Sequence, residues 1–201
     1  MSETVSVIID GSQVEILAGS TILAACRSVG NDQPTLCYLE TLTPVNVCRV
    51  CMVEVEGSRT LVPSCSRVVE EAMVVKTDSE RVRHSRKVVF EFLASSVDLS
   101  LVDEPTRGWM DRYQCDPSRY RPAAPVFDDR DRRRSGHHHL PSGEFSETVN
   151  QPVKIDNSLY IRDYSKCILC YKCVSACGED AQNTFAIAVA GRGFDARIST
   201  E

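Results

Sequence analysis

Alternating apolar and polar positions at the start of the chain predict a β-hairpin. Residues 4–9 and 13–17 both alternate in this way, and Asp10-Gly11-Ser12 between them is a strong turn signal. Residues 19–30 then predict a short helix, because apolar side chains repeat on one face. That face contains Ile22, Leu23, Cys26 and Val29, with Gly19 and Ser20 before the helix and Gly30 at its C-terminal cap.

Three further strand-like runs follow a cysteine-bearing loop at residues 33–49. They span residues 52–56, 60–65 and 73–77, and a turn joins the first two. The pattern therefore predicts a β-rich unit with one helix over residues 1–78.

Helical periodicity replaces the strand pattern over residues 79–96, with Asp78 or Ser79 as the expected N-cap. The expected apolar stripe contains Val82, Val89, Phe92 and Leu93, whereas Arg81, Arg83, Arg86 and Lys87 are expected outside it. Residues 103–121 predict only weak helix, since Trp109 and Tyr113 form the single apolar i, i+4 pair between two prolines.

Proline, glycine and charged residues dominate residues 122–153, which predict a flexible linker. Order signals return after it. Residues 159–162 predict a short strand, and residues 185–190 and 194–198 predict a hairpin around Gly191. The expected organisation is therefore a domain at residues 1–78, a helical connector at 79–121, a linker at 122–153 and a C-terminal segment at 154–201.

Composition narrows the functional classes. The 201 residues carry 23 Lys and Arg against 28 Asp and Glu, a net charge of −5, which argues against nucleic acid or an anionic membrane as a partner. Neither a secretory signal peptide nor a membrane span is predicted, so we expect a cytoplasmic protein that meets a membrane only through its partners. Ten cysteines in a reducing compartment favour metal ligation over disulfides.

Four cysteines in the N-terminal part are spaced as ligands of a two-iron cluster. Cys37, Cys48, Cys51 and Cys65 follow the pattern C-x10-C-x2-C-x13-C, a plant-type ferredoxin arrangement with a longer first loop. Backbone N–H groups of such a loop can donate to the sulfurs and stabilise the reduced cluster. A structural zinc site and plain core thiols are the alternatives. Arg49, between the paired cysteines, either raises the cluster potential or simply reaches solvent.

Four more cysteines form the strongest motif in the chain. Cys167, Cys170, Cys173 and Cys177 follow C-x2-C-x2-C-x3-C, in which three thiolates can hold three corners of a 4Fe-4S cluster. The fourth cysteine of such runs commonly ligates a different cluster, and Gly178 replaces the proline that usually follows it. Zinc is the weaker alternative, and a 3Fe-4S cluster on three thiolates is a further one.

The two groups, in this order and with their flanks, resemble a known family. The stretch TLCYLETLTPVNVCRVCMVEV is similar to the 2Fe-2S domain that opens the large iron–sulfur subunit of respiratory complex I, the diaphorase subunit of NAD-reducing hydrogenases and the alpha subunit of NAD-dependent formate dehydrogenases. The stretch DNSLYIRDYSKCILCYKCVSACGEDAQNTFAIAVAGRGFDARI is similar to the start of their two-cluster ferredoxin module. The resemblance covers most of residues 3–98 and 154–198. It implies an α+β chain with a plant-type 2Fe-2S ferredoxin (β-grasp) domain, then a helix, a linker and a bacterial-ferredoxin-like 4Fe-4S segment.

Two departures from the family limit what it implies. The family's His-Cys 4Fe-4S motif between the two modules is reduced to Cys115, and His84 lies within the predicted helix, so we expect that cluster to be missing. The second C-x2-C-x2-C-x3-C run of the family does not follow residue 197. We expect the chain to be the front part of a longer subunit, or its last site to be a single cluster closed by Cys177 or another ligand.

Other tempting residues have ordinary interpretations. Cys26 shares its predicted helical face with apolar residues and is expected in the core. Cys115 is expected to be inert. Three adjacent histidines, His137, His138 and His139, lie beside arginines in the predicted linker and favour a solvated, pH-sensitive segment over a metal site.

These features predict an electron-transfer subunit or domain that carries no catalytic residues of its own. The ligand spacing predicts the relay, and the resemblance implies the partners: a flavin- and NAD-binding subunit and a subunit with a catalytic metal centre. A formate dehydrogenase-like complex is our first expectation, with complex I-like or hydrogenase complexes as the alternative. A redox-sensing or structural iron–sulfur protein, and a zinc-binding interaction module, are the alternatives of another class.

Overall fold

The computed structural model describes residues 3–120, 137–138, 148–149, 153–192 and 196–199. It divides the chain into two compact units, Met1–Val89 and Phe90–Glu201. Most of the predicted linker at residues 122–153, including His139, lies outside the described residues. Each unit is therefore considered by itself.

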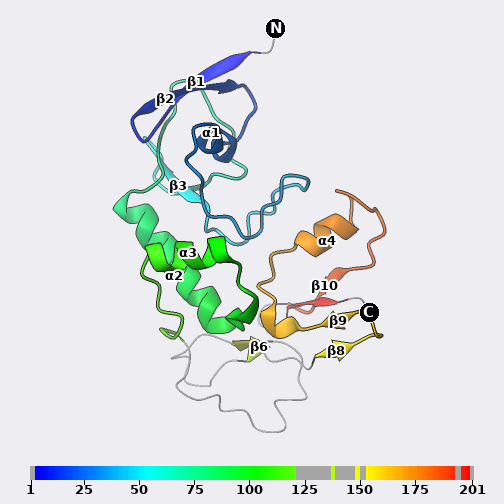
Figure 1. Cartoon of the computed structure of the whole chain (residues 1–201). Coiled ribbons are helices and arrows are strands. Elements are labelled where there is room, and N and C mark those ends of the chain that lie inside the picture. Colours follow the sequence, from blue (N-terminus) through cyan, green and yellow to red (C-terminus); the bar gives the residue numbers. More distant parts are fainter. Residues whose placement is uncertain (1–2, 121–136, 139–147, 150–152, 193–195, 200–201) are drawn as a thin grey trace. The chain divides into compact units, whose positions relative to one another are not determined.

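A five-stranded mixed sheet forms the frame of the first unit (Figure 1). Its strands lie in the order β2-β1-β5-β3-β4, and β1 and β5 pair in parallel while the other pairs are antiparallel. The bounds are β1 Thr4–Ile9, β2 Ser12–Leu17, β3 Met52–Val55, β4 Val62–Pro63 and β5 Val74–Lys76. All five strands were predicted from the sequence, although β3, β4 and β5 are shorter than expected.

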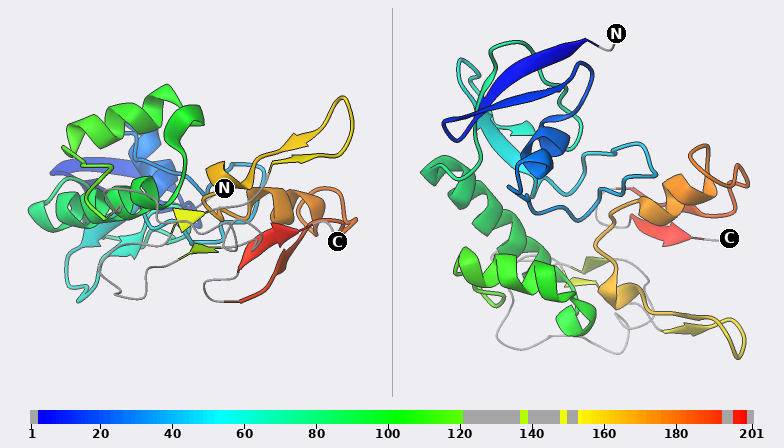
Figure 2. Two further views of the ribbon diagram at one scale, coloured as in Figure 1. Left: turned by 90° about the horizontal axis from the view of Figure 1, so that it is seen from below. Right: turned by 45° about the horizontal axis from the view of Figure 1, so that its top comes forward.

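Helix α1, Ile22–Ser28, covers one face of this sheet and completes the core (Figure 2). The period-two pattern of the strands places alternate side chains toward the helix, which is why the core contains Val7, Ile9, Val14, Val53 and Val75 together with Ile22, Ala25 and Cys26. The prediction that Cys26 is a core thiol is confirmed, since it is fully buried.

The ends of α1 differ slightly from the prediction. Thr21 is the N-cap, and its hydroxyl accepts the N–H of Ala24 at 3.2 Å. Val29 is 47% exposed, so its assignment to the apolar face was wrong. The chain turns away there because Gly30 adopts a φ of 72°, and the N–H groups of Gly30 and Asn31 close the helix on Arg27 and Cys26.

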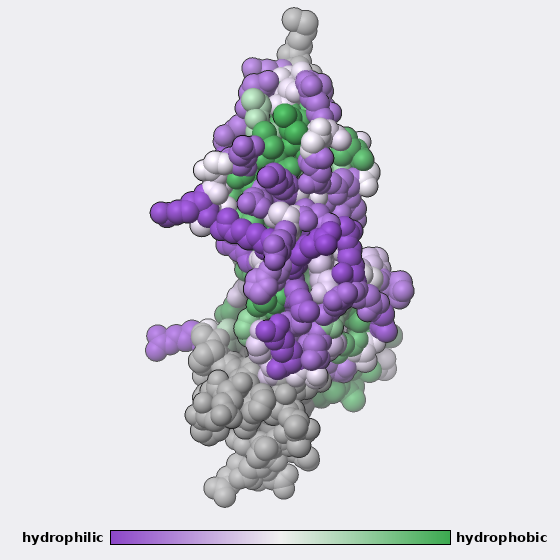
Figure 3. Space-filling model, turned by 90° about the vertical axis from the view of Figure 1, so that its left-hand side faces the viewer, coloured by the Kyte–Doolittle hydropathy of each residue, from purple (hydrophilic) through white to green (hydrophobic). Residues whose placement is uncertain are grey.

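On the face drawn in Figure 3, hydrophilic residues make up most of the described surface. A small apolar area over the first unit is surrounded there by polar side chains. No helix among the described residues is both long enough and apolar enough to cross a membrane.

Helix α2, Glu80–Ser96, confirms the predicted helix, with Ser79 as its N-cap through a 3.3 Å bond from Val82 N–H. Its buried face is rotated from the expectation. Arg86 was expected outside the apolar stripe but is only 1% exposed, whereas Phe92, expected inside it, is 47% exposed. Phe90 is buried in place of Phe92, because the buried positions repeat every fourth residue from Val82.

The segment after α2 is more ordered than its sequence suggests. The 3-10 turn η1, Leu99–Leu101, leads to helix α3, Glu104–Arg112. The expectation of weak helix was wrong because Asp103 accepts the N–H of Thr106 at 2.9 Å and Pro105 occupies the first turn, where it favours a helix start. The predicted pair of Trp109 and Tyr113 stacks at 5.8 Å between ring centroids.

Buried Glu91 of α2 holds the chain that follows α3. Its carboxylate accepts the N–H of Asp116 at 3.1 Å and pairs with Arg119 at 2.7 Å. Cys115 lies half-buried in this stretch, and its N–H bonds to Met110 O.

The rest of the second unit consists of short elements. They are the pairs β6 His137–His138 with β7 Thr148–Val149, β8 Lys154–Ile155 with β9 Ile161–Arg162, and β10 Ala188–Ala190 with β11 Arg197–Ser199, together with η3 Tyr164–Lys166 and α4 Lys172–Cys177. The predicted strand at residues 159–162 and the hairpin around Gly191 are both confirmed, with shorter strands.

Candidate iron–sulfur sites

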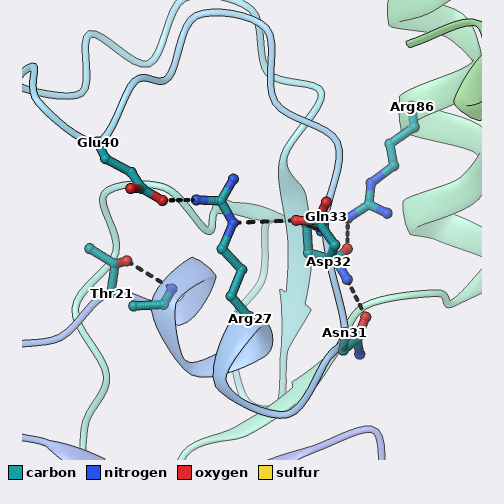
Figure 4. A network of polar contacts seen from close by, with 8 residues as sticks. Thr21, Arg27, Asn31, Asp32, Gln33, Glu40 and Arg86 are labelled. Carbon is teal, nitrogen blue, oxygen red and sulfur yellow. Dashed lines mark hydrogen bonds and ion pairs between the residues drawn. The ribbon is translucent and has the colours of Figure 1, made fainter. Parts of the chain in front are cut away.

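Cys37, Cys48 and Cys51 lie on an irregular loop that begins after α1 and ends where β3 starts, and Cys65 follows β4. Buried Arg86 ties the two ends of this loop together. Its guanidinium donates to Gln33 Oε1 at 2.7 Å (Figure 4). It also donates to the carbonyl of Met52, the residue after Cys51, at 2.8 Å. A hydrogen bond to a charged donor stabilises more than a neutral one, so this contact fixes the loop strongly.

The anchor continues through a chain of side chains into the sheet. Gln33 donates to Asn31, and Asn31 donates to Asp10 at 2.8 Å. Asp10 in turn accepts both the backbone N–H and the hydroxyl of Thr77, at 2.8 and 2.6 Å. The start of the cysteine loop is thereby connected to α2 and to the first hairpin.

A second arginine holds the outer part of the loop. Arg27 of α1 pairs with Asp32 at 3.3 Å and with Glu40 at 2.8 Å, as Figure 4 shows. Its guanidinium also lies 5.4 Å from the ring centre of Tyr38, the neighbour of Cys37.

The four sulfurs of this group are arranged as two pairs. The Sγ atoms of Cys51 and Cys65 lie 3.4 Å apart, and Cys37 and Cys48 share a hydrogen bond. Three of the thiols are almost fully buried, with exposed fractions of 5% for Cys37, 2% for Cys51 and 0% for Cys65. Two thiolates on one tetrahedral iron, with bonds of about 2.3 Å, would lie about 3.7 Å apart, so the pair of Cys51 and Cys65 is near the spacing that one metal ion requires.

Each pair contains one acidic thiol. The hydrogen bond with Cys48 lowers the pKa of Cys37 to about 5, and the hydrogen bond with Cys65 lowers the pKa of Cys51 to about 6. The pKa values of Cys48 and Cys65 are raised by the same bonds and by burial. Since metal ligands are thiolates, loading this site must release the protons that Cys48 and Cys65 retain.

Polar groups surround the pair of Cys51 and Cys65. Asn46, in the left-handed region with a φ of 59°, has its side-chain oxygen 3.2 Å from Cys65 Sγ and accepts the Ser66 hydroxyl at 2.8 Å. Arg49 also has a φ of 59°, and its exposed side chain reaches solvent.

The second cysteine group lies on a turn and a short helix. Leu169 and Tyr171 both adopt positive φ, 53° and 62°, and so wind the backbone around Cys170 before α4 begins. Cys167, Cys170 and Cys173 are partly or fully exposed. Cys167 interacts electrostatically with Cys170 and Cys173, so the three thiols lie near one another.

Cys177 differs from these three because its sulfur is buried, with 5% exposure. It accepts the N–H of Ala186 at 3.1 Å and lies 3.1 Å from the Thr184 hydroxyl. The bond with Thr184 lowers the pKa of Cys177, so its thiolate form is favoured. Gly178 closes α4 next to it, and a Cβ there would lie 3.2 Å from Val174 O, which explains a residue without a side chain at this position.

Both donor sets fit clusters better than single ions. Within the described ranges, no three Cys, His, Asp or Glu side chains converge as ligands of one metal ion. Four sulfurs in two pairs match two irons of a 2Fe-2S cluster, whereas a zinc ion needs all four at about 2.3 Å from one point. The open set of Cys167, Cys170 and Cys173 leaves room for a larger cluster.

The sequence did not single out Arg86, Asn46 or the Glu91 anchor. A signal for Arg86 did exist, since it stands four residues from both Val82 and Phe90 on the buried face of α2. Asn46 and Glu91 act through contacts distant in sequence, for which periodicity has no signal. His84 lies within α2, as predicted, and is exposed.

The mixed sheet with its covering helix and the two thiol sets define an α+β iron–sulfur protein. Residues 2–80 match the family model of a 2Fe-2S iron–sulfur cluster binding domain, and residues 160–182 match that of a 4Fe-4S binding domain. The expected 2Fe-2S and 4Fe-4S cofactors are thus confirmed.

Relatives are found among subunits of large oxidoreductases. The chain is 30% identical over 201 residues to an NADH-quinone oxidoreductase subunit of Rhizobium meliloti, with 97% of this chain and 21% of that protein covered. It is 36% identical over 199 residues to NADP-reducing hydrogenase subunit HndD of Solidesulfovibrio fructosivorans, with 96% and 31% covered. Its fold matches a crystal structure of an NAD+-reducing NiFe hydrogenase with a TM-score of 0.68 and 21% identity, covering 96% of this chain and 74% of that one.

The chain thus matches the N-terminal iron–sulfur region of the complex I large-subunit and NAD-reducing hydrogenase family, as its motifs suggested. It spans about a fifth to a third of the length of these two curated relatives.

Proposed function

We propose that this chain is an electron relay between an NAD(H)- and flavin-binding module and a catalytic metal centre of a multisubunit oxidoreductase. In this proposal Cys37, Cys48, Cys51 and Cys65 hold the 2Fe-2S cluster, and Cys167, Cys170, Cys173 and Cys177 supply ligands to the 4Fe-4S cluster. The single observation that carries it is the pairing of buried sulfurs in the first unit, in a chain whose second unit holds an independent thiol set.

When bound, such clusters accept and release one electron each without making or breaking substrate bonds, at about −400 mV for plant-type 2Fe-2S centres. The residues of the chain do the remaining work. Arg86 and Arg27 hold the loop in place before and after electron transfer, so little reorganisation accompanies a change of charge. Burial of Cys37, Cys51 and Cys65 keeps water from the sulfurs.

The names of the relatives favour particular partners. They belong to an NADH-quinone oxidoreductase and an NADP-reducing hydrogenase, so we place this chain in a complex I-like or hydrogenase-like assembly. Formate oxidation, our first sequence-based expectation, has no support from these names.

Spectroscopy of the chain with its native partners tests the relay. For each copy of this chain, the complex should contain about six irons and six acid-labile sulfides in addition to those that its partners bind. NADH should reduce both clusters within the turnover time of the complex, so that the EPR signals of the reduced clusters appear. Clusters that dithionite reduces but NADH leaves oxidised in the intact complex would instead support a sensing or structural role.

A further inference from the structure

Asn46 contacts two residues at the far end of the first cysteine group. Its side-chain oxygen lies 3.2 Å from Cys65 Sγ and 2.8 Å from the hydroxyl of Ser66, which stand 19 and 20 residues further along the chain. Both neighbours donate to this one oxygen. In the part of the chain that the structure describes, no acceptor takes the N–H groups of the same amide. The amide therefore uses only its acceptor end.

The backbone at Asn46 does not by itself require an asparagine. Its φ of 59° lies in the left-handed region, which asparagine tolerates and glycine adopts without a steric penalty. A glycine would form the same turn before Cys48 without bringing a side chain to a sulfur. The turn alone therefore does not account for the contacts of the amide.

The hydrogen-bonding character of Cys65 changes when it becomes a cluster ligand. As a thiol it donates to Asn46, whereas a cysteine ligand carries no hydrogen and only accepts. An amide oxygen facing a negatively charged sulfur at this distance is repelled by it. Half a turn of the amide about its last torsion removes the repulsion, because the nitrogen then takes the place of the oxygen.

The turned amide matches both of its neighbours. Its nitrogen carries two hydrogens, one for the Cys65 sulfur and one for the Ser66 oxygen, because a hydroxyl both donates and accepts. Asn46 and Ser66 are only partly buried, so water reaches the turned amide oxygen and the released Ser66 O–H. The three side chains can therefore reverse the direction of their hydrogen bonds without leaving a polar group unpaired.

We propose that Asn46 is a positioning residue for the 2Fe-2S cluster, whose amide accepts from the Cys65 thiol and turns to donate to the Cys65 sulfur when this residue is a ligand. The proposal rests on the ligand set proposed above. Reduction adds one negative charge to the cluster, and a donor to a ligand sulfur stabilises the more negative state. Asn46 thereby raises the midpoint potential of this cluster.

Asn46→Gly tests the proposal, because it removes the amide and keeps the turn. In the intact chain with both clusters, the 2Fe-2S midpoint potential should fall by about 59 mV, a tenfold shift of the one-electron equilibrium. Titration with dithionite measures this potential whether or not NADH reduces the cluster in the complex. An unchanged or higher potential would overturn the role of Asn46.

A spectroscopic test needs no substitution. With ¹⁵N placed only in the side-chain amides of asparagine, HYSCORE spectra of the reduced 2Fe-2S cluster should show a weakly coupled ¹⁵N nucleus. The coupling should vanish in Asn46→Gly. A parent chain without this coupling would show that the amide nitrogen does not face the sulfur, and the proposal would be wrong.

Matched variants separate the hydrogen bond from general damage. Asn183 also has a positive φ, 52°, and Asn183→Gly makes the same change in the second unit, so the 2Fe-2S potential should stay unchanged. An equal fall in this variant would contradict a specific role for Asn46. Asn46→Asp keeps the shape of the side chain without its N–H groups, and a parent-like potential in it would likewise contradict the proposal. A 2Fe-2S signal that survives Cys65→Ala would instead refute the ligand set itself.

Discussion

The two cysteine groups are built on very different supports. In the first unit the sulfurs lie at the edge of a packed sheet-and-helix core, and buried Arg86 fixes the loop that carries them. In the second cysteine group three of the four thiols are partly or fully exposed, on a turn and the six-residue helix α4. Between residues 153 and 199, Cys177 and Ile198 are the hydrophobic side chains that the described structure buries.

This difference indicates that the two cysteine sites are organised in different ways. The first site is shaped by the fold before a metal binds, so its cluster adds stability to an existing core. In the second site we expect the cluster itself to supply much of the missing core, as in small metal-binding domains whose folding energy is largely binding energy. The same cofactor chemistry therefore has different structural roles in one chain.

The largest test replaces one ligand in each unit. Cys48→Ser should abolish the 2Fe-2S EPR signal and destabilise residues 33–66, because the remaining thiols cannot complete both irons. Cys170→Ser should remove the 4Fe-4S signal and leave the 2Fe-2S signal intact. Cys26→Ala is the control, since its buried thiol belongs to the core. Iron loss in that control would contradict our assignment of Cys26.

Removal of iron should then separate the two units. After anaerobic chelation, amide hydrogen exchange should remain slow in β1, β5 and α1, which are held by the apolar core. Exchange should become fast over residues 164–187, where little buried apolar surface remains. Equal protection in both units after chelation would show that the second site is as preorganised as the first.

Loss of the buried arginine should weaken the first unit alone. Arg86→Met leaves Gln33 Oε1 and Met52 O without their charged donor and should lower the free energy of unfolding by about 2–4 kcal/mol. Urea unfolding of the iron-free chain, followed through amides of β3, measures this. Arg83→Met, on the exposed side of the same helix, should cost less than about 1 kcal/mol. A similar loss in both variants would show that Arg86 acts as an ordinary surface charge.

The smallest expected effect is a pH response within the second unit. Lys166 and then the N–H of Ser100 lower the pKa of Asp98 to about 2. Because the folded pKa lies below the usual value of 3.8, this contact stabilises the fold above about pH 4 and is lost as pH falls toward 2. An NMR titration of the Asp98 carboxyl should give this low midpoint, and Lys166→Met should move it upward. The first unit should show no change in this variant.

Much of the molecule could be predicted from the sequence because the relevant forces are local. Strand alternation located β1 and β2, and a period of 3.6 located α2, since these patterns follow from backbone geometry. Cysteine spacing predicted both cofactors, because cluster ligands must reach one small object from a short stretch of chain. The helix α3 was underestimated, because its cap at Asp103 outweighs a weak apolar pattern.

Only the tertiary structure decided which polar groups are buried and what they contact. Arg86 and Gln33 are 53 residues apart, and Glu91 and Arg119 are 28 apart, so no local pattern pairs them. The sulfur pairs likewise depend on how a loop folds back on β4. The sequence by itself determined that this chain binds two kinds of iron–sulfur cluster. Packing decided that one site is held by the core while the other lies on a thinly supported segment, because burial depends on contacts between distant parts of the chain.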